Sequence, residues 1–106
     1  MKIGLKLWSS NQSYFEDARC FFQEGLYDFI ELYIDLNATG ETWKIWEEIG
    51  CDIRLHAPHS YGGFNPAQSE KFMQNMEVIK TVDEYQRFFH SESIIFHPGI
   101  DGKLEE

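Results

Sequence analysis

Hydrophobic and polar residues alternate along three stretches of the chain and, less regularly, along a fourth. These stretches are residues 2–8, 29–36, 52–57 and 93–97. Alternation with a period of two predicts β-strands with one apolar and one polar face. The separation is cleanest in the second stretch, where one face carries Ile30, Leu32, Ile34 and Leu36. The opposite face of that stretch carries Phe29, Glu31, Tyr33 and Asp35.

Apolar residues at helical spacing occupy the first two intervals between these predicted strands. In the first interval, Ser13 and Glu16 form a capping-box signature, and Gly25 is placed as a C-terminal cap. The residues expected on the buried side of this helix are Phe15, Ala18, Phe22 and Leu26. A second helix is predicted over residues 39–49, with Trp43, Trp46 and Ile49 as its apolar residues.

The third interval contains a longer helical pattern. Asn65 as the N-cap and Pro66 at the first helical position predict a helix that continues to about Phe89. Its buried side is expected to carry Phe72, Met76, Ile79 and Val82. Residues 101–106 are typical of the beginning of a fourth helix.

Strands that alternate with helices predict a parallel sheet with right-handed crossovers. Parallel strands covered on both faces are usually apolar throughout, so the polar second face favours the interior of a barrel. A TIM barrel takes about 200–250 residues or more, whereas this chain has 106. We therefore expect one α/β domain over residues 1–106 with parallel β/α units forming half of a TIM barrel, with four strands and three full helices.

Two explanations of a half-barrel follow from this pattern. Because the fourth helical pattern is incomplete, we expect a fragment of a longer barrel. The alternative is a natural half-barrel that pairs with another chain. A half-barrel has two unpaired sheet edges, which favour association, so this alternative predicts a homo-oligomer formed through the exposed edges.

Composition and charge narrow the classes of partner. The chain has 18 acidic and nine basic residues, a net charge of −9, which makes nucleic acid an unlikely partner because phosphate binding needs a basic surface. No apolar run approaches the roughly 18–20 residues of a membrane helix, and residues 1–8 lack signal-peptide features. We expect a cytoplasmic protein with no membrane partner. Cys20 and Cys51 are expected to be buried and reduced.

Two of the four histidines stand at the ends of predicted strands. His56 ends the third strand in LHAPH (55–59), and His97 ends the fourth in IIFHPG (94–99). Functional residues of barrels lie at the C-terminal ends of strands, so adjacent strands should bring these imidazoles together. Neutral imidazole is the commonest metal ligand and a general base. The alternative is that each histidine only forms a structural hydrogen bond.

Acidic residues on the polar face are the next candidates. Glu31 and Asp35 can serve as a third metal ligand or as an acid or base. The alternative is that they form ion pairs with Lys6 and Arg54 inside the barrel.

Three further side chains are candidates for substrate contacts. Trp8 and Tyr33 can pack against a sugar ring, although aromatic residues more often belong to the core. His59 can reach the site from the loop after the third strand. His90 ends the long helix, where a cation suits the helix dipole, and no catalytic role is expected of it.

The motifs LHAPHS and IIFHPG resemble the xylose-isomerase-like TIM-barrel superfamily. This superfamily contains sugar and sugar-phosphate isomerases and epimerases together with AP endonucleases of the endonuclease IV type. The stretches MKIGLKL and YDFIELYID are similar to its first two strands. The resemblance covers nearly the whole chain, but only the first half of the family's barrel.

The resemblance implies roles for individual residues. Histidines at the positions of His56 and His97 are zinc ligands in the endonuclease branch, whereas these strand ends line the substrate pocket in the epimerase branch. In the epimerase branch, carboxylates and a histidine from strands five to eight hold the metal. Glu31 resembles the strand-two glutamate of the sugar-isomerase branch. His59 replaces a tyrosine common in the endonucleases, which together with the charge argues against DNA repair.

We therefore expect the N-terminal half of a sugar or sugar-phosphate isomerase or epimerase that depends on a divalent metal (Zn, Mn or Mg). Its substrate is a small carbohydrate, and the half alone is an incomplete catalyst. The predicted site residues are Glu31 and His56 for catalysis, Trp8, Tyr33 and His59 for substrate, and His56 and His97 for metal. The alternatives are a zinc phosphodiesterase acting on abasic DNA and a non-catalytic half-barrel for binding or assembly.

Overall fold

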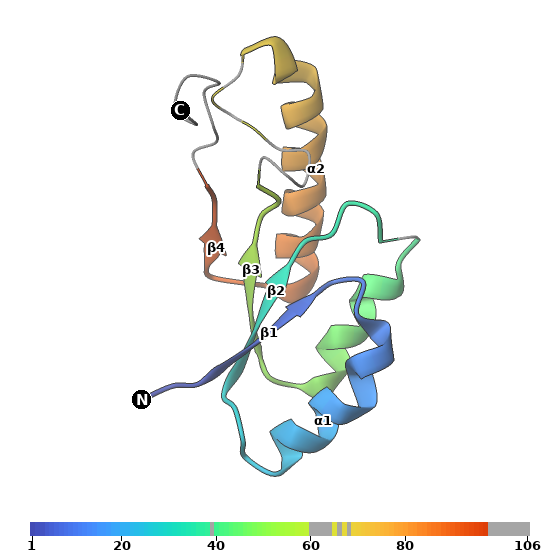
Figure 1. Ribbon diagram of the computed structural model, residues 1–106, viewed down its shortest axis with the longest axis vertical. Helices are drawn as coiled ribbons and strands as arrows, with labels where there is room; N and C mark the ends of the chain where they lie inside the picture. Colours follow the sequence, from blue (N-terminus) through green and yellow to red (C-terminus); the bar gives the residue numbers. More distant parts are fainter. Residues whose placement is uncertain (39, 60–64, 66, 68, 98–106) are drawn as a thin grey trace, which may run out of the picture.

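Four parallel strands form a single sheet in the computed structural model, which describes residues 1–106 except 39, 60–64, 66, 68 and 98–106. The strands are β1 (Gly4–Trp8), β2 (Phe29–Tyr33), β3 (Asp52–His56) and β4 (Ile94–Ile95). They lie in the order β1-β2-β3-β4, and each neighbouring pair is parallel. Figure 1 shows this order. The predicted parallel α/β architecture is confirmed, with strands shorter than the sequence pattern suggested.

Helical segments fill the intervals between the strands. The segments are η1 (Gln12–Tyr14), α1 (Phe15–Gln23), η2 (Thr42–Ile49), η4 (Ser69–Lys71) and α2 (Phe72–Phe89). Among them, α1, η2 and α2 lie on the same side of the sheet (Figure 1). The second helical segment is a 3-10 helix throughout, and its three predicted apolar residues, Trp43, Trp46 and Ile49, are buried as expected.

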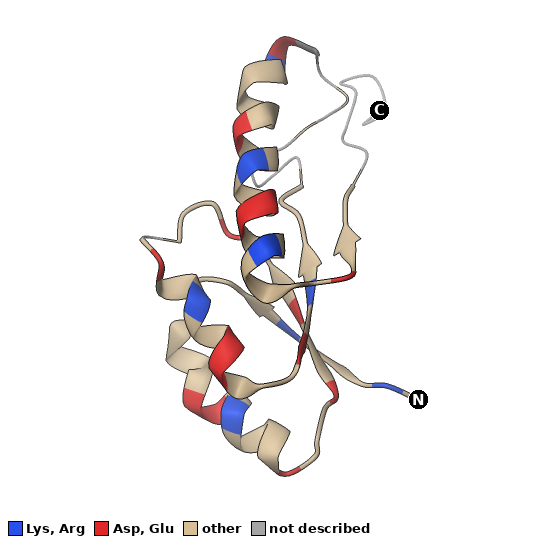
Figure 2. Cartoon of the chain, turned by 180° about the vertical axis from the view of Figure 1, so that it is seen from behind, with Lys and Arg blue, Asp and Glu red and all other residues tan. Residues whose placement is uncertain are grey.

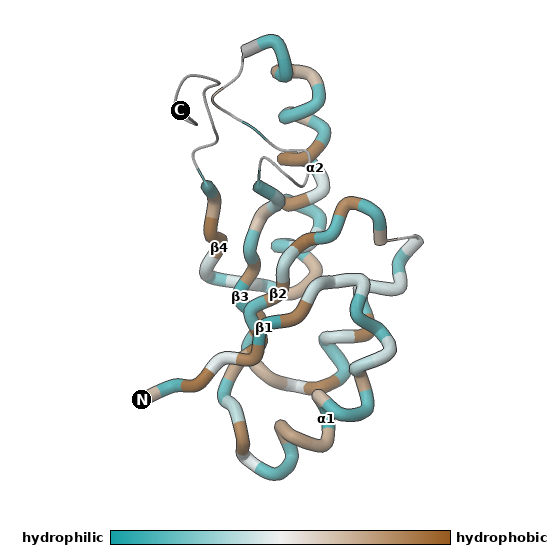
Figure 3. Tube along the Cα trace, in the orientation of Figure 1, coloured by the Kyte–Doolittle hydropathy of each residue, from teal (hydrophilic) through white to brown (hydrophobic). Residues whose placement is uncertain are grey.

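The strand register sorts the side chains into rows on two faces. On the face toward the helices, one row consists of the buried residues Leu7, Leu32 and Leu55. The opposite face, called the polar face from here on, carries the rows Lys6–Glu31–Arg54 and Trp8–Tyr33–His56. Figure 3 shows the alternation of hydrophobic and hydrophilic positions along the strands. One face of the sheet therefore forms the core, and the other is left for polar chemistry.

Ser9 is a buried polar residue that ties several elements together at the end of β1. Its side chain is fully buried. The Ser9 hydroxyl accepts hydrogen bonds from the Tyr85 hydroxyl (3.0 Å) and the Asp35 backbone N–H (2.9 Å). Its carbonyl accepts a hydrogen bond from the Trp46 indole N–H at 3.2 Å. The network joins β1 to η2, α2 and the segment after β2, which fixes the position of the neighbouring Trp8.

The beginning and the end of α1 differ from the predictions. The N-cap is Tyr14 rather than Ser13, and no side chain caps the helix. The reason is that η1 precedes α1, so Ser13 lies inside a helical turn instead of before one. Leu26 is 57% exposed, because Gly25 adopts a φ of 77° and ends the helix before it. Cys20 is exposed rather than buried.

Of the four residues predicted on the buried side of α2, only Val82 is buried. Phe72, Met76 and Ile79 are 61%, 38% and 42% exposed. The buried residues are Asn75, Val78, Val82 and Tyr85. Two hydrogen bonds explain why the side of α2 that carries Asn75 faces the interior. The Asn65 N–H donates to Asn75 Oδ1 (3.0 Å), and Asn75 Nδ2 donates to the Asn65 carbonyl (2.8 Å).

The boundaries of the long helix also changed. Asn65 does not cap α2, whose regular part begins at Phe72 after the short η4 turn. Pro66, predicted at the first helical position, lies outside the described residues, as does the predicted fourth helix over residues 101–106. At its other end, α2 finishes with His90 in the left-handed conformation (φ 53°).

Charged residues along α2 form pairs on its exposed surface. Lys80 lies 3.2 Å from Glu77, and Arg87 lies 2.8 Å from Asp83. Figure 2 shows acidic and basic residues alternating along this helix. Within the described part of the chain, no helix is long and apolar enough to cross a membrane.

We expect the protein to lose stability between about pH 10 and about pH 12. Burial raises the pKa of both Tyr27 and Tyr85 from 10.0 to about 12. The unfolded chain therefore ionises first, and the stability these hydroxyls contribute is complete below about pH 10 and lost as the pH rises to about 12. Urea unfolding across this range measures the fall. Tyr85→Phe should reduce it, and an equal fall in both proteins would contradict the prediction.

Candidate functional site

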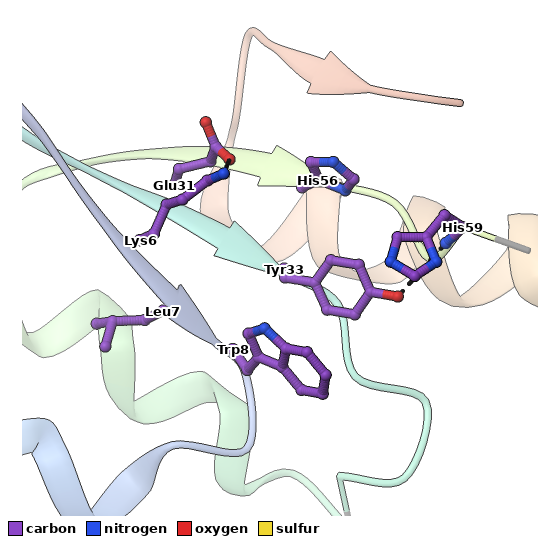
Figure 4. Close-up of a pocket in the computed structure, with 7 residues that line it drawn as sticks. All are labelled: Lys6, Leu7, Trp8, Glu31, Tyr33, His56 and His59. Carbon is purple, nitrogen blue, oxygen red and sulfur yellow. Dashed lines mark hydrogen bonds and ion pairs between the residues drawn. The ribbon is translucent and has the colours of Figure 1, made fainter. Parts of the chain in front are cut away.

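A cavity of about 240 Å³ opens on the polar face near the C-terminal ends of β1, β2 and β3. Its lining residues are Lys6, Leu7, Trp8, Glu31, Tyr33, His56 and His59. Figure 4 shows these side chains around the cavity. One cavity is therefore lined by four of the predicted site residues on the strands and by His59 from the segment after β3.

Backbone hydrogen bonds continue past the strand ends and hold this rim in place. The Ser9 N–H donates to the Tyr33 carbonyl at 2.8 Å, and the Ile34 N–H donates to the His56 carbonyl at 2.9 Å. The Ala57 N–H donates to the Ile95 carbonyl at 2.9 Å. The side chains at the rim are thus fixed by the sheet rather than by a free loop.

The structure brings His56 and His97 together, as their positions at adjacent strand ends predict. Their Nε2 atoms are 3.0 Å apart, although β4 ends at Ile95 and His97 follows it. His56 Nδ1 lies 2.7 Å from the Ala57 carbonyl oxygen. A carbonyl only accepts hydrogen bonds, so Nδ1 carries the hydrogen and Nε2 of neutral His56 keeps a lone pair. The Nε2–H of His97 then donates to that lone pair.

The pair fits two adjacent ligands of one metal ion. Two nitrogens that each lie about 2.0–2.1 Å from a tetrahedral zinc ion are separated by roughly 3.3–3.4 Å, and the observed separation of 3.0 Å is a few tenths of an ångström shorter. Metal-binding histidines usually donate their second ring N–H to a carbonyl or carboxylate, as His56 does to Ala57. Among the described residues, no group of three or more His, Cys, Asp or Glu side chains is arranged to hold a metal. This pair could therefore supply no more than two ligands to a metal ion, and any further ligand would have to come from outside the described residues.

An aromatic pair forms one wall of the cavity. The rings of Trp8 and Tyr33 have centroids 4.9 Å apart and are tilted by 34°. The Tyr33 ring also lies 5.3 Å from the ring of His56 and 5.3 Å from that of His59. Trp8 is 53% exposed, so it is not a core residue. The pair offers an accessible aromatic surface beside the imidazoles.

Glu31 lies in the row below the histidine. Its carboxylate is 3.6 Å from Lys6 Nζ, so one of the predicted ion pairs is present. The Lys6 side chain is 80% exposed, and such pairs contribute little to stability. Glu31 precedes Tyr33 by two residues on β2, about 6.6 Å along the strand. It lines the same cavity as His56 without a direct contact to it.

The other predicted ion pairs differ from expectation. Arg54 lies 3.5 Å from Asp52, and among the described ion pairs it has none with Glu31, its register partner, or with Asp35. Asp35 instead accepts hydrogen bonds from the Ser10 hydroxyl and, at 2.9 Å, from the Asn37 N–H. Asp35 is therefore held by its neighbours above the aromatic pair rather than by a cation.

His59 lies at the side of the cavity, on the segment after β3. Its ring centroid is 5.9 Å from that of His97 and 6.5 Å from that of His56. Its backbone N–H donates to the Tyr33 hydroxyl at 3.4 Å. These distances place it beside the imidazole pair, within reach of a ligand in the cavity.

Ser9 is the residue that the sequence interpretation missed. It follows β1 in the register of Leu5 and Leu7, on the face toward the core. A polar residue at an apolar position has to find hydrogen-bond partners when it is buried. A serine at a position where the alternation expects an apolar residue was therefore the signal in the sequence that could have identified Ser9.

Comparisons with protein-family models, curated proteins and solved structures found no match. The fold and the site define a parallel α/β protein with paired imidazoles at the C-terminal edge of its sheet. Any assignment of function rests on this geometry.

Proposed function

We propose that the chain is the N-terminal half of a TIM-barrel isomerase or epimerase that acts on a sugar or sugar phosphate with a divalent metal. The observation that carries the proposal is the 3.0 Å separation of the Nε2 atoms of His56 and His97. The sequential strand order and the placement of α1, η2 and α2 on one side of the sheet support a half-barrel. In a barrel the polar face becomes the interior and the strand ends form the mouth.

In this proposal each side chain of the cavity has a separate role. His56 and His97 would hold a divalent ion, with His56 oriented by its hydrogen bond to Ala57. When bound, such an ion would supply polarisation of a carbonyl or hydroxyl oxygen of the sugar. The Trp8–Tyr33 pair packs against the apolar face of the sugar ring. His59 contacts hydroxyl groups from the side.

Glu31 is the proposed acid and base. Isomerisation and epimerisation both remove a proton from carbon and return one, which a carboxylate near the bound sugar can do. Glu31 lines the cavity one row below His56, and a substrate would have to replace Lys6, whose exposed ion pair with Glu31 is weak. Because the described residues contain no complete set of metal ligands, the proposal treats this chain as an incomplete catalyst alone.

One observation favours a non-catalytic binding or assembly module as a second candidate. His56 and His97 already satisfy each other through a direct hydrogen bond, which is sufficient for a structural role. The endonuclease alternative gains no comparable support, because Lys6 and Arg54 on the polar face are each paired with a carboxylate. Phosphodiester binding needs unpaired cations.

The alternative of a natural half-barrel predicts that two copies associate, and a cytoplasmic location is proposed in either case. Within the described residues, β1 and β4 each pair with a single neighbour, which leaves one edge of each strand unpaired. Ile95 and Phe96 beside the β4 edge are 40% and 48% exposed. These features suit a second copy at the sheet edges.

Binding of neutral monosaccharides in the presence of zinc tests the proposed carbohydrate site. We expect Trp8→Ala to weaken binding about tenfold, equivalent to the roughly 1.4 kcal/mol that an aromatic contact can supply. Isothermal titration calorimetry with a panel of pentoses and hexoses measures the effect. Tyr14→Ala is the matched control, because Tyr14 is 55% exposed and does not line the cavity. Equal affinity in Trp8→Ala and wild type, or no binding of any sugar, would overturn the proposal.

A further inference from the structure

A second cavity adjoins the first. It has a volume of about 160 Å³. Its lining residues are Trp8, Tyr33, Ile34, Asp35, Leu36, Asn37 and His59. Three of these, Trp8, Tyr33 and His59, also line the first cavity. The two cavities are therefore neighbours with a common wall.

The order of residues along the chain shows how the cavities are arranged. Glu31 lines only the first cavity, Asp35 lines only the second, and Tyr33 lines both. Alternate residues of an extended chain are about 6.6 Å apart, so the cavities follow one another along β2 and the segment after it. In Figure 4 the Tyr33 ring lies between Trp8 and His59, at this boundary.

Size favours a ligand that occupies both cavities. Binding sites for small molecules usually measure about 300–1,000 Å³. The first cavity is about 240 Å³ and the second about 160 Å³, so each falls short of that range while the two together enter it. A ligand with two parts of similar size matches this division.

The lining of the second cavity indicates the chemistry of the second part. Ile34 is buried and Leu36 is 37% exposed, which gives an apolar surface. Asp35 is held by the Ser10 hydroxyl and the Asn37 N–H, yet a carboxylate has about four acceptor positions and keeps some for a ligand. The Asn37 side chain adds an amide with both donors and an acceptor. Mixed apolar contact and hydroxyl recognition suit a sugar ring.

Charge excludes a phosphate from the second cavity. Among its described lining residues, Asp35 is acidic and there is no lysine or arginine. A phosphate placed there would face the Asp35 carboxylate without a cation, which is unfavourable. The second part of the ligand therefore carries no phosphate.

We infer that the two cavities are consecutive subsites for a neutral carbohydrate of two rings, such as a disaccharide or the end of an oligosaccharide. The reacting ring lies beside His56 and Glu31, and the second ring lies beside Asp35 and Asn37. Tyr33 and Trp8 contact both rings at the boundary. This inference rests on the proposed carbohydrate function and specifies its substrate as unphosphorylated.

Calorimetry with matched sugars in the presence of zinc tests the inference. The probes are glucose, galactose and xylose, the disaccharides cellobiose, lactose and xylobiose, and glucose 6-phosphate. At least one disaccharide should bind tenfold more tightly than its monosaccharide and than the phosphate. Asn37→Ala, at an exposed position, and Asp35→Asn should each remove most of this advantage. Asp52→Asn, at the opposite end of β3, is the control.

The outcomes show whether the inference fails alone or together with the proposed function. Monosaccharides that bind as tightly as disaccharides would overturn the two-ring inference and leave the carbohydrate site standing. Tightest binding of glucose 6-phosphate would overturn the neutral substrate. A disaccharide advantage that survives both Asn37→Ala and Asp35→Asn would overturn the placement of the second ring. No binding of any sugar would overturn the proposed function and the inference together.

Discussion

Replacing Trp46 by alanine is expected to lower the free energy of unfolding by about 3–5 kcal/mol, the usual cost of deleting a buried aromatic side chain. Trp46 is fully buried, and its ring centroid lies 6.0 Å from that of Phe15. Its indole N–H also donates to the Ser9 carbonyl, which would lose that partner. Small domains have only about 5–15 kcal/mol of total stability. The variant should therefore unfold at much lower urea concentration than the wild type.

Trp8→Ala is the matched control for this experiment. Trp8 is 53% exposed, so we expect its removal to cost about 1 kcal/mol or less, in the range typical of surface changes. Trp46→Phe should recover part of the loss by refilling the cavity. Equal losses of stability in Trp46→Ala and Trp8→Ala would contradict the assignment of one tryptophan to the core and the other to the site.

Loss of both imidazoles is expected to abolish metal binding. We expect His56→Ala/His97→Ala to weaken zinc binding by more than about 100-fold, because removal of an outer-shell partner alone costs roughly 10–100-fold. The reason is that the two Nε2 atoms, 3.0 Å apart, are the paired ligands that this chain supplies. Calorimetric titration of the purified protein with zinc, followed by metal analysis after dialysis, measures the effect.

His90→Asn is the control for the histidine variant. It removes one imidazole away from the cavity, and Asn suits the left-handed conformation that His90 adopts at the end of α2. Zinc affinity should stay at the wild-type level in His90→Asn and fall in each single variant of the pair. Wild-type affinity in the double variant would reject a metal site at His56 and His97 and leave the structural hydrogen bond as their role.

Alternation along the strands was sufficient to predict the polar face. Because side chains of a strand point to opposite faces with a period of two, Trp8, Tyr33 and His56 had to share a face once the strands were parallel and in register. The meeting of His56 and His97 followed from their positions at adjacent strand ends. These features depend only on local periodicity and on the order of the strands.

The buried side of α2 depends on tertiary contacts that periodicity does not specify. Apolar residues occur on two sides of this helix, so the pattern through Phe72, Met76 and Ile79 was as regular as the side that is actually buried. Asn75 determines which of the two sides is buried, because it hydrogen-bonds to Asn65 ten residues earlier. A polar residue in the core is difficult to predict without its partner.

The sequence pattern also could not predict which residues pair with the charged and polar groups at the site. The alternation placed Arg54 and Asp35 on one face, yet Arg54 pairs with Asp52, and Asp35 is held by Ser10 and Asn37. Ser9 joins Tyr85 across 76 positions of the chain. Side-chain conformations and long-range contacts decide these pairs, and neither is encoded in a local period.

Nitrogen-15 NMR of the imidazole rings during a zinc titration tests the central claim most directly. Before zinc is added, His56 should be the tautomer with hydrogen on Nδ1, since Nδ1 lies 2.7 Å from the Ala57 carbonyl oxygen. With one equivalent of zinc, the Nε2 resonances of His56 and His97 should shift together while His56 Nδ1 stays protonated. A His56 tautomer with hydrogen on Nε2, or zinc shifts at neither or only one of the two rings, would contradict a paired metal site.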